Sequence, residues 1–411
     1  MSSAPTIIIA GAGIGGLTAA HALAGSGFRV LLFERARQLS DVGAGLQLSP
    51  NAARILIELG LAERLKPHVV APQEICIHAA SGTRLARIPL GKLAAARYGA
   101  PYWVIHRADL QSALAEAVRA NPNITLTLDA ELGSFIGSAE GVTVHVVTGR
   151  TCIATDGARL DIRGRILVGA DGLSSTVRHW LLQGRSASNP PRYTNRTAWR
   201  ATVPDIAVPA EFREPAVHLW LGRYAHLVHY PVKGGTAVNM VAITQDRSDR
   251  PGWSAEAGAP DEVLAHFPPG DWCAEARTVL GAPDRWLRWP LFDRKPAAHW
   301  GSGPVTLLGD AAHPSLPFLA QGAAMAIEDA AVLANCLKMA PEAPEQALRR
   351  YEDQRRSRTA RVQRTARRNG RIYHLGGLPA AARNHVLRRL DGERLLARFD
   401  WLYDWRPDAR D

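Results

Sequence analysis

The hydrophobic positions at the start of the chain follow a strand–helix–strand pattern. Residues 6–10 form an unbroken apolar run, which is typical of a strand buried on both faces in a parallel sheet. The next segments predict a helix over residues 15–25 and a second strand over residues 29–34. Glycines fill the turn between the first strand and the helix. The pattern therefore predicts a βαβ unit of about 30 residues, which opens an α/β fold.

Helices and strands continue to alternate after this unit. Ser49 and Pro50 predict the start of a helix, because serine favours the N-cap and proline the first helical position. Alternating polar and apolar residues from 73 to 88 predict a small antiparallel excursion. The pattern then predicts a helix over residues 107–120 and strands over residues 124–128, 142–147 (part of a hairpin) and 166–170.

The middle of the chain has the pattern of an antiparallel sheet. Predicted strands cover residues 198–203, 217–221, 226–232 and 237–243. A Lys233-Gly234-Gly235 turn joins the last two of them. After this region, a strand over residues 305–308 and a helix over residues 322–337 return to the first domain. Helices predicted over residues 345–373 and 383–399 close the chain.

This order of elements predicts a two-domain α/β protein with a helical C-terminal region. The first domain comprises residues 1–180, with the excursion near 73–105, and a second part at 296–340. The antiparallel domain comprises residues 181–295 and is expected to form the substrate side of a binding site. The helical region comprises residues 341–411.

The charge of the chain raises the question of nucleic-acid binding. The formal net charge is +11, and only five of the 49 basic residues are lysines. Many arginines crowd between residues 355 and 371, without any zinc-finger, RNP or basic-zipper pattern. We therefore expect an exposed, Arg-rich helix that attracts small anionic substrates, and no nucleic-acid partner.

The cysteines and the apolar runs limit the remaining classes. Cys76, Cys152, Cys273 and Cys336 lack paired spacing, which argues against a disulfide framework, a zinc site or a CxxC redox motif. We expect no metal site and a reducing, cytoplasmic location. No run approaches the roughly 20 apolar residues of a membrane span, so a membrane partner is not expected.

The glycine-rich turn matches a dinucleotide-binding fingerprint. In Gly11-Ala12-Gly13-Ile14-Gly15-Gly16, the first glycine allows the tight turn and Gly13 lets the backbone approach a pyrophosphate. Gly16 lets the helix pack closely on the strand, and the helix N-terminus attracts phosphate. Glu34, followed by Arg35, lies where a carboxylate accepts hydrogen bonds from a ribose. The motif predicts nucleotide binding without identifying the nucleotide.

Three later segments carry further polar residues at the ends of predicted elements. Arg107 begins a helix, where it either reaches a cofactor or simply pairs with Asp109. Asp171-Gly172 ends one apolar strand. Gly309-Asp310 ends another and opens the string Gly309-Asp310-Ala311-Ala312-His313-Pro314. Asp310 there either binds a cofactor hydroxyl or is a buried capping residue.

The fingerprint followed by these two strings resembles the single-component (class A) FAD-dependent aromatic hydroxylases. The resemblance covers nearly the whole chain. It implies a Rossmann-like FAD-binding domain of the glutathione-reductase type, a middle antiparallel-sheet substrate domain and C-terminal helices. It also implies that Arg107 reaches back to FAD and that Asp310 binds a ribityl hydroxyl. The segment around Asp171 supports the FAD region or NAD(P)H use, and the helix start at Gly322-Ala323 faces the flavin pyrimidine.

The middle domain indicates which reaction the flavin serves. His226 and Tyr230 lie on one face of a predicted strand, and His229 lies on the other. A histidine and a tyrosine that project together can bind and deprotonate a phenol; the alternative is two hydrogen-bonded sheet residues. The motif His226-x-x-x-Tyr230-Pro231 is similar to the salicylate hydroxylase and 3-hydroxybenzoate 6-hydroxylase branch. The resemblance implies hydroxylation of a phenolic aromatic acid.

The resemblance implies a mechanism as well. NADH or NADPH reduces FAD, the reduced flavin takes up O₂, and a flavin C4a-hydroperoxide transfers oxygen to the ring. Water must be excluded, and residues 314–318, with Leu319, are expected to form part of the lid. Arg200 is a candidate donor for a substrate carboxylate. Relatives that act on 3-hydroxybenzoate carry a polar residue where Pro317 stands, which leaves the ring position open.

Two other classes compete with this hypothesis. One is a flavin monooxygenase or epoxidase of a non-phenolic substrate, which would not need His226 and Tyr230. The other is a non-catalytic flavin-binding redox protein, which would show no substrate-stimulated NAD(P)H oxidation. The sequence also leaves open whether the C-terminal region covers the active site or forms a homodimer.

Overall fold

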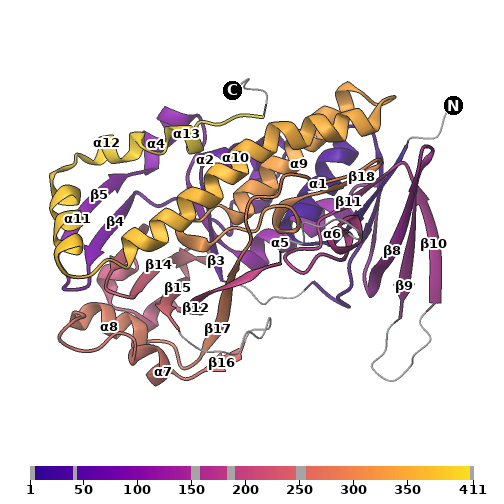
Figure 1. The fold of residues 1–411 in the computed structure, drawn as a ribbon. Coiled ribbons are helices and arrows are strands. Elements are labelled where there is room, and N and C mark those ends of the chain that lie inside the picture. The colour runs from indigo at the N-terminus through magenta and orange to yellow at the C-terminus, as the bar shows by residue number, and fades with distance from the viewer. Residues whose placement is uncertain (1–4, 40–43, 150–157, 183–189, 247–255, 408–411) are drawn as a thin grey trace.

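The fold is built on two large sheets that lie side by side (Figure 1). The computed structural model describes residues 5–39, 44–149, 158–182, 190–246 and 256–407. Cys152 lies outside these residues. Within them, no helix is both long enough and apolar enough to cross a membrane. The mixed α/β class predicted from the sequence is confirmed.

The first sheet is parallel and has the order β18-β11-β1-β2-β7. Its central strand β1 carries three consecutive isoleucines (Ile7, Ile8, Ile9) without any exposed surface, which explains the unbroken apolar run. The helices α1, α5 and α9 pack in this part of the molecule. The bounds are β1 Thr6–Ala10, β2 Arg29–Phe33, β7 Ile124–Thr127, β11 Ile166–Gly169, β18 Val305–Leu307, α1 Ile14–Gly25, α5 Arg107–Arg119 and α9 Gly322–Met339.

A separate three-stranded antiparallel sheet extends the predicted hairpin. It has the order β10-β9-β8 and stands at one side of the molecule (Figure 1). Its bounds are β8 Ala130–Ser138, β9 Gly141–Thr148 and β10 Ala158–Gly164. The short helix α6 (Thr176–Leu181) packs against β8.

The second large sheet has eight strands in the order β16-β17-β12-β15-β14-β13-β4-β5. The predicted excursion, β4 and β5, is antiparallel as expected, but it belongs to this sheet because β4 pairs with β13 in parallel. This sheet thus joins residues of the predicted first and middle domains, and the domain bounds stay a prediction. The strands are β4 Glu74–Ala79, β5 Arg84–Pro89, β12 Arg192–Pro204, β13 Ala216–Leu221, β14 Ala225–Val232, β15 Ala237–Gln245, β16 Glu256–Gly258 and β17 Trp286–Asp293.

Shorter elements complete the two sheets. A two-stranded sheet of β3 and β6 connects to the helix α2, which begins at Pro50 as predicted. The helices α7 and α8 supply Val263, Val279 and Leu280 to a hydrophobic core under one face of the eight-stranded sheet. The bounds are β3 Gly45–Leu48, β6 Trp103–His106, α2 Pro50–Glu58, α3 Ala62–Leu65, α4 Gly91–Tyr98, α7 Pro260–Leu264 and α8 Ala274–Gly281.

The C-terminal helices differ from the prediction in one respect. The long helix α10 (Pro344–Tyr373) is close to its expected bounds, but the single helix expected over residues 383–399 is wrong. Leu390 is extended, and the Asp391 carboxylate accepts hydrogen bonds from the backbone N–H groups of Glu393 and Arg394. These contacts start a new helix. The segment therefore contains α11 (Gly377–Arg389), α12 (Gly392–Ala397) and α13 (Asp400–Tyr403).

The expectation of an exposed arginine helix is also wrong in part. Arg355 and Arg358, one turn apart on α10, are buried and bind carboxylates of α9. Arg355 Nε donates to Asp329 over 2.7 Å, and Arg358 donates twice to Glu328 over 2.7 Å. Their charges are matched inside the core, whereas the arginine-rich composition alone indicated a solvated surface. Arg361, Arg364, Arg368 and Arg371 on the same helix are exposed.

The buried pairing predicts unequal effects of two neighbouring substitutions on α10. Arg355→Met should lower the free energy of unfolding by about 3–5 kcal/mol, because two carboxylates lose a buried partner. Arg356→Met is the matched control, since Arg356 is partly exposed and pairs with the exposed Asp353. It should cost less than about 1 kcal/mol. Chemical denaturation of both variants measures this, and equal losses would contradict the assignment.

Candidate active site

Two adjoining cavities lie at the carboxyl ends of the parallel strands, the smaller beside β1, β2 and β11 and the larger between β11, β18 and the eight-stranded sheet. Open α/β sheets bind ligands at this end of their strands. With their open mouths included, the cavities measure about 740 Å³ and 1460 Å³. Both are lined by Gly13, Ala170 and Gly172, so together they form one elongated site.

The fingerprint glycines divide into those that packing requires and one that it does not. A Cβ on Gly16 would lie 1.9 Å from the carbonyl oxygen of Gly11, and one on Gly11 would lie 2.6 Å from that of Ala170. Gly11 also has a φ of +99°, which favours glycine. A Cβ on Gly13, in contrast, would meet no described atom within 4 Å. The open space at Gly13 therefore faces the cavity.

The N-terminus of α9 repeats this arrangement on the opposite wall. A Cβ on Gly322 would meet no described atom within 4 Å, and Gly322 and Ala323 line the larger cavity. Ile14 and Gly15, at the start of α1, line it as well; Gly15 is also close-packed, because its Cβ would lie 2.7 Å from Leu308. Two helix N-termini, each with partial positive charge, therefore border the site.

Glu34 and Arg35 line the smaller cavity at the end of β2. The Glu34 carboxylate accepts hydrogen bonds from the N–H groups of Ala12 (2.7 Å) and Ala36 (3.0 Å), which fix its position. Asp171 lines the same cavity and also accepts from the Ser175 hydroxyl and the Val177 N–H. Asp171 thus has a structural contact with the start of α6, and burial raises the pKa of its carboxyl.

Asp310 is an exposed residue on the wall of the larger cavity. The surrounding protein raises the pKa of its carboxyl, while His313 and Arg107 oppose this shift. The turn before it is fixed, because Gly309 has a φ of +63° and its N–H donates to Asp329 over 3.0 Å. Arg107 lines the same cavity and, among the described residues, makes no ion pair with Asp109.

His226 and Tyr230 project from β14 into the larger cavity, and His229 packs on the other face of the sheet. His226 Nδ1 lies 2.8 Å from His374 Nε2, and burial lowers the pKa of His226 well below its usual value. Its imidazole is therefore neutral near pH 7. Burial raises the pKa of Tyr230 above its usual range, so its phenol stays protonated.

Of two further residues at the site, Arg200 was a candidate from the sequence and His374 was not. Arg200 on β12 lines the cavity, and its buried Nε has no hydrogen-bond partner among the described residues. His374, at the end of α10, is 148 positions from His226, and no local pattern relates the two. Only the fold brings them together.

The loop of residues 314–319 has two faces. Ser315 and Pro317 line the cavity. Leu316 and Phe318 are buried in a hydrophobic cluster instead, with the Phe318 ring 5.4 Å from that of His226. The loop therefore borders the cavity through Ser315 and Pro317, and its role as a lid stays a prediction.

The chain is similar to several known flavoproteins. A family model described as FAD binding domain matches residues 4–366. A 3-hydroxybenzoate 6-hydroxylase of Polaromonas naphthalenivorans is 34% identical over 97% of this chain and 96% of its own length. A 3-amino-4-hydroxybenzoate 2-monooxygenase of Streptomyces cremeus is 38% identical over 98% of this chain and 97% of its own. A solved substrate complex of salicylate hydroxylase has a TM-score of 0.80 and 25% identity, covering 99% of this chain and 97% of that one.

Fold, cavity and relatives together define a flavoprotein monooxygenase. The chain belongs to the FAD binding domain family, and its resemblance to the single-component aromatic hydroxylases is confirmed. The residues fit the cofactor: the open faces of Gly13 and Gly322 leave room for a ligand along both helix N-termini. The individual residue roles remain proposals.

The two kinds of glycine predict different outcomes for alanine substitutions. Gly13→Ala should lower FAD affinity at least about tenfold while changing the stability of the FAD-free protein by less than about 1 kcal/mol. Gly16→Ala should destabilise the FAD-free protein by about 1–3 kcal/mol, because its methyl group meets a carbonyl oxygen. FAD fluorescence titration and thermal unfolding measure both. Normal FAD binding by Gly13→Ala would refute the assignment.

Proposed function

We propose that the protein uses FAD, NAD(P)H and O₂ to hydroxylate a phenolic aromatic acid of the hydroxybenzoate or salicylate type. The observation that supports this most directly is the meeting of Arg200, His226 and Tyr230 in one cavity. A cation and two groups that can bind a phenol suit a substrate with a carboxylate and a ring hydroxyl. The named activities of the relatives point to the same substrate class.

The elongated cavity assigns each part of the cofactor to residues of this chain. Glu34 would bind the ribose in the smaller cavity, and the start of α1 at Gly13 would bind the pyrophosphate. Asp310 and Arg107 would hold the ribityl region, and the N-terminus of α9 would stabilise negative charge on the flavin. When bound, FAD supplies the two-electron chemistry with NAD(P)H and O₂ that amino-acid side chains lack.

His226 is the proposed base for the substrate hydroxyl. If its Nδ1–H donates to His374 Nε2, the remaining nitrogen, Nε2, is unprotonated and can accept the phenol proton. The lowered pKa keeps His226 neutral and also makes it a weaker base, so proton transfer relies on the bound phenolate to stabilise the imidazolium. The Tyr230 hydroxyl would hydrogen-bond to the same substrate oxygen. Loss of the phenol proton raises the electron density of the ring, which favours attack on an electrophilic oxygen.

Arg200 is the proposed partner of the substrate carboxylate. Arg200 is half-buried, its Cζ lies 6.0 Å from the centre of the Trp289 ring, and it makes no ion pair with a described residue. A carboxylate in the cavity would pair with the guanidinium and offset its charge. Binding would therefore favour anionic substrates.

The first experiment is a turnover assay of the purified holoenzyme. NADH and NADPH oxidation is followed with salicylate, 3-hydroxybenzoate, 4-hydroxybenzoate and hydroxynicotinates, and the products are identified by mass. We expect at least one acid to stimulate oxidation and to yield a product one oxygen atom heavier. Oxidation without stimulation by any phenolic acid would indicate a non-phenolic substrate or a non-catalytic flavoprotein.

The proposed base predicts a selective loss of turnover. His226→Ala should lower kcat for the phenolic substrate by about 10²–10⁴, because the proton acceptor is lost. His229→Ala is the matched control on the same strand, since His229 faces away from the cavity. Rates are normalised to bound FAD. If His226→Ala retains turnover within about tenfold, the phenol-deprotonation role is wrong.

The proposed carboxylate site predicts a change in specificity. Arg200→Gln should raise KM for the phenolic acid by about ten- to a hundredfold, because a charge-assisted contact is lost. The corresponding phenol without a carboxylate serves as the control substrate, and its KM should not rise. Equal effects on both compounds would place the carboxylate elsewhere.

A further inference from the structure

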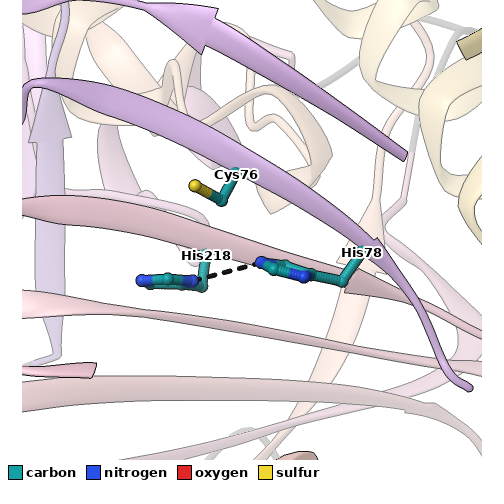
Figure 2. A group of neighbouring side chains, drawn as sticks. All are labelled: Cys76, His78 and His218. Atoms are coloured by element: carbon teal, nitrogen blue, oxygen red, sulfur yellow. Dashed lines mark hydrogen bonds between the residues drawn. The ribbon is translucent and has the colours of Figure 1, made fainter. Parts of the chain in front are cut away.

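A cluster of metal-ligating side chains lies outside the flavin cavity. Cys76 and His78 on β4 and His218 on β13 offer one sulfur and two ring nitrogens, all within 4.8 Å of one another. Figure 2 shows the two imidazoles nearly end to end and joined by their hydrogen bond, with the Cys76 side chain above them in the view. The register explains the grouping, because His218 pairs with Cys76 across the two strands and alternate residues share a face.

The cluster and the proposed active site occupy opposite faces of one sheet. His218 stacks on His229 with ring centroids 4.6 Å apart, and His229 faces away from His226 and the cavity. Cys76, His78 and His218 do not line the flavin cavities. A ligand bound at the cluster would therefore leave the flavin and the substrate untouched.

The spacing of the two imidazoles is that of a metal chelate. His78 Nε2 and His218 Nδ1 are 3.2 Å apart. Two nitrogens at about 2.0–2.1 Å from a tetrahedral zinc ion are themselves about 3.3 Å apart. The separation of the two nitrogens therefore matches that of a chelate, and the hydrogen-bonded rings must rotate so that both lone pairs point to one ion, which the thiol can then approach.

Metal binding at the cluster must displace the proton of the Cys76 thiol. The Cys76 thiol donates to the Glu74 carboxylate over 3.1 Å. A metal cation that binds the sulfur displaces this proton, which leaves through Glu74 to solvent. A water molecule then completes the coordination, because the Glu74 carboxylate is paired with Arg87.

The cluster has an open side. Its two imidazoles share one hydrogen bond, between His78 Nε2 and His218 Nδ1. His78 is only partly buried, which gives an ion a path from solvent. A built, mostly dry site with an open side is what a metal requires.

We propose that Cys76, His78 and His218 form a Zn²⁺ site that clips β4 to β13. One thiolate and two neutral imidazoles form a donor set suited to zinc. The strands that it joins form the one parallel pair in the eight-stranded sheet, and they come from segments far apart in the chain. The ion would thus strengthen the junction between the excursion and the antiparallel strands.

Cobalt provides a direct test on the full-length holoenzyme. After metal is removed with a chelator, Co²⁺ should give tetrahedral d–d bands to the red of the flavin absorption, saturating at one equivalent. Zn²⁺ should bleach these bands and raise the thermal midpoint. The absence of such bands, or capture of Cu⁺ with no response to Co²⁺ or Zn²⁺, would overturn the zinc assignment.

Substitutions then locate the site. Cys76→Ser should weaken Co²⁺ binding by more than about a hundredfold, since even outer partners of metal sites contribute ten- to a hundredfold. Cys273→Ser is the matched control, because Cys273 is a free, half-buried thiol outside the cluster. His78→Gln provides a second, less buried test if Cys76→Ser folds poorly. Unchanged binding in His78→Gln and in a folded Cys76→Ser would refute the proposal.

Discussion

The geometry of the active site depends on a buried group of opposite charges between α9 and α10. Asp329 accepts hydrogen bonds from Arg355, His313 and the N–H of Gly309, which are drawn from separate segments. Burial raises its pKa, but the charges of His313 and Arg355 lower it to about 2. The carboxylate is therefore ionised, and in a nearly dry core it must keep these partners. Because it holds the turn before Asp310, the same carboxylate sets one wall of the cavity.

Local patterns were sufficient for much of this architecture. The pattern of neighbouring residues is enough to indicate that the isoleucines of β1 are buried and that the fingerprint glycines lie in a tight turn. Both features could therefore be predicted from the sequence. The two-residue period of β14 likewise separated His226 and Tyr230 from His229. In each case the information lies within a few neighbouring residues.

Features set by distant contacts could not be predicted in this way. Arg355 and Arg358 belong to a run of arginines that is typical of a solvated helix, and only the facing carboxylates of α9 explain their burial. The path of α10 brings His374 next to His226. Strand pairing likewise brings Cys76 together with two histidines, a cluster that the spacing of the cysteines along the chain does not indicate. The helix break at Leu390 likewise depends on the Asp391 cap, which a hydrophobic pattern of helical period does not indicate.

The parallel pairing of β4 with β13 has a consequence for how the chain folds. The antiparallel strands after residue 190 do not form a closed unit, because β13 would present an unpaired edge if the excursion were missing. Exposed edges of this kind recruit other strands and promote aggregation. The eight-stranded sheet can be completed only after both segments have been synthesised and brought together, and such long-range pairing is slow. The strands β4 and β5 are synthesised early, and they protect the edge of β13, which is synthesised much later, from pairing with other chains.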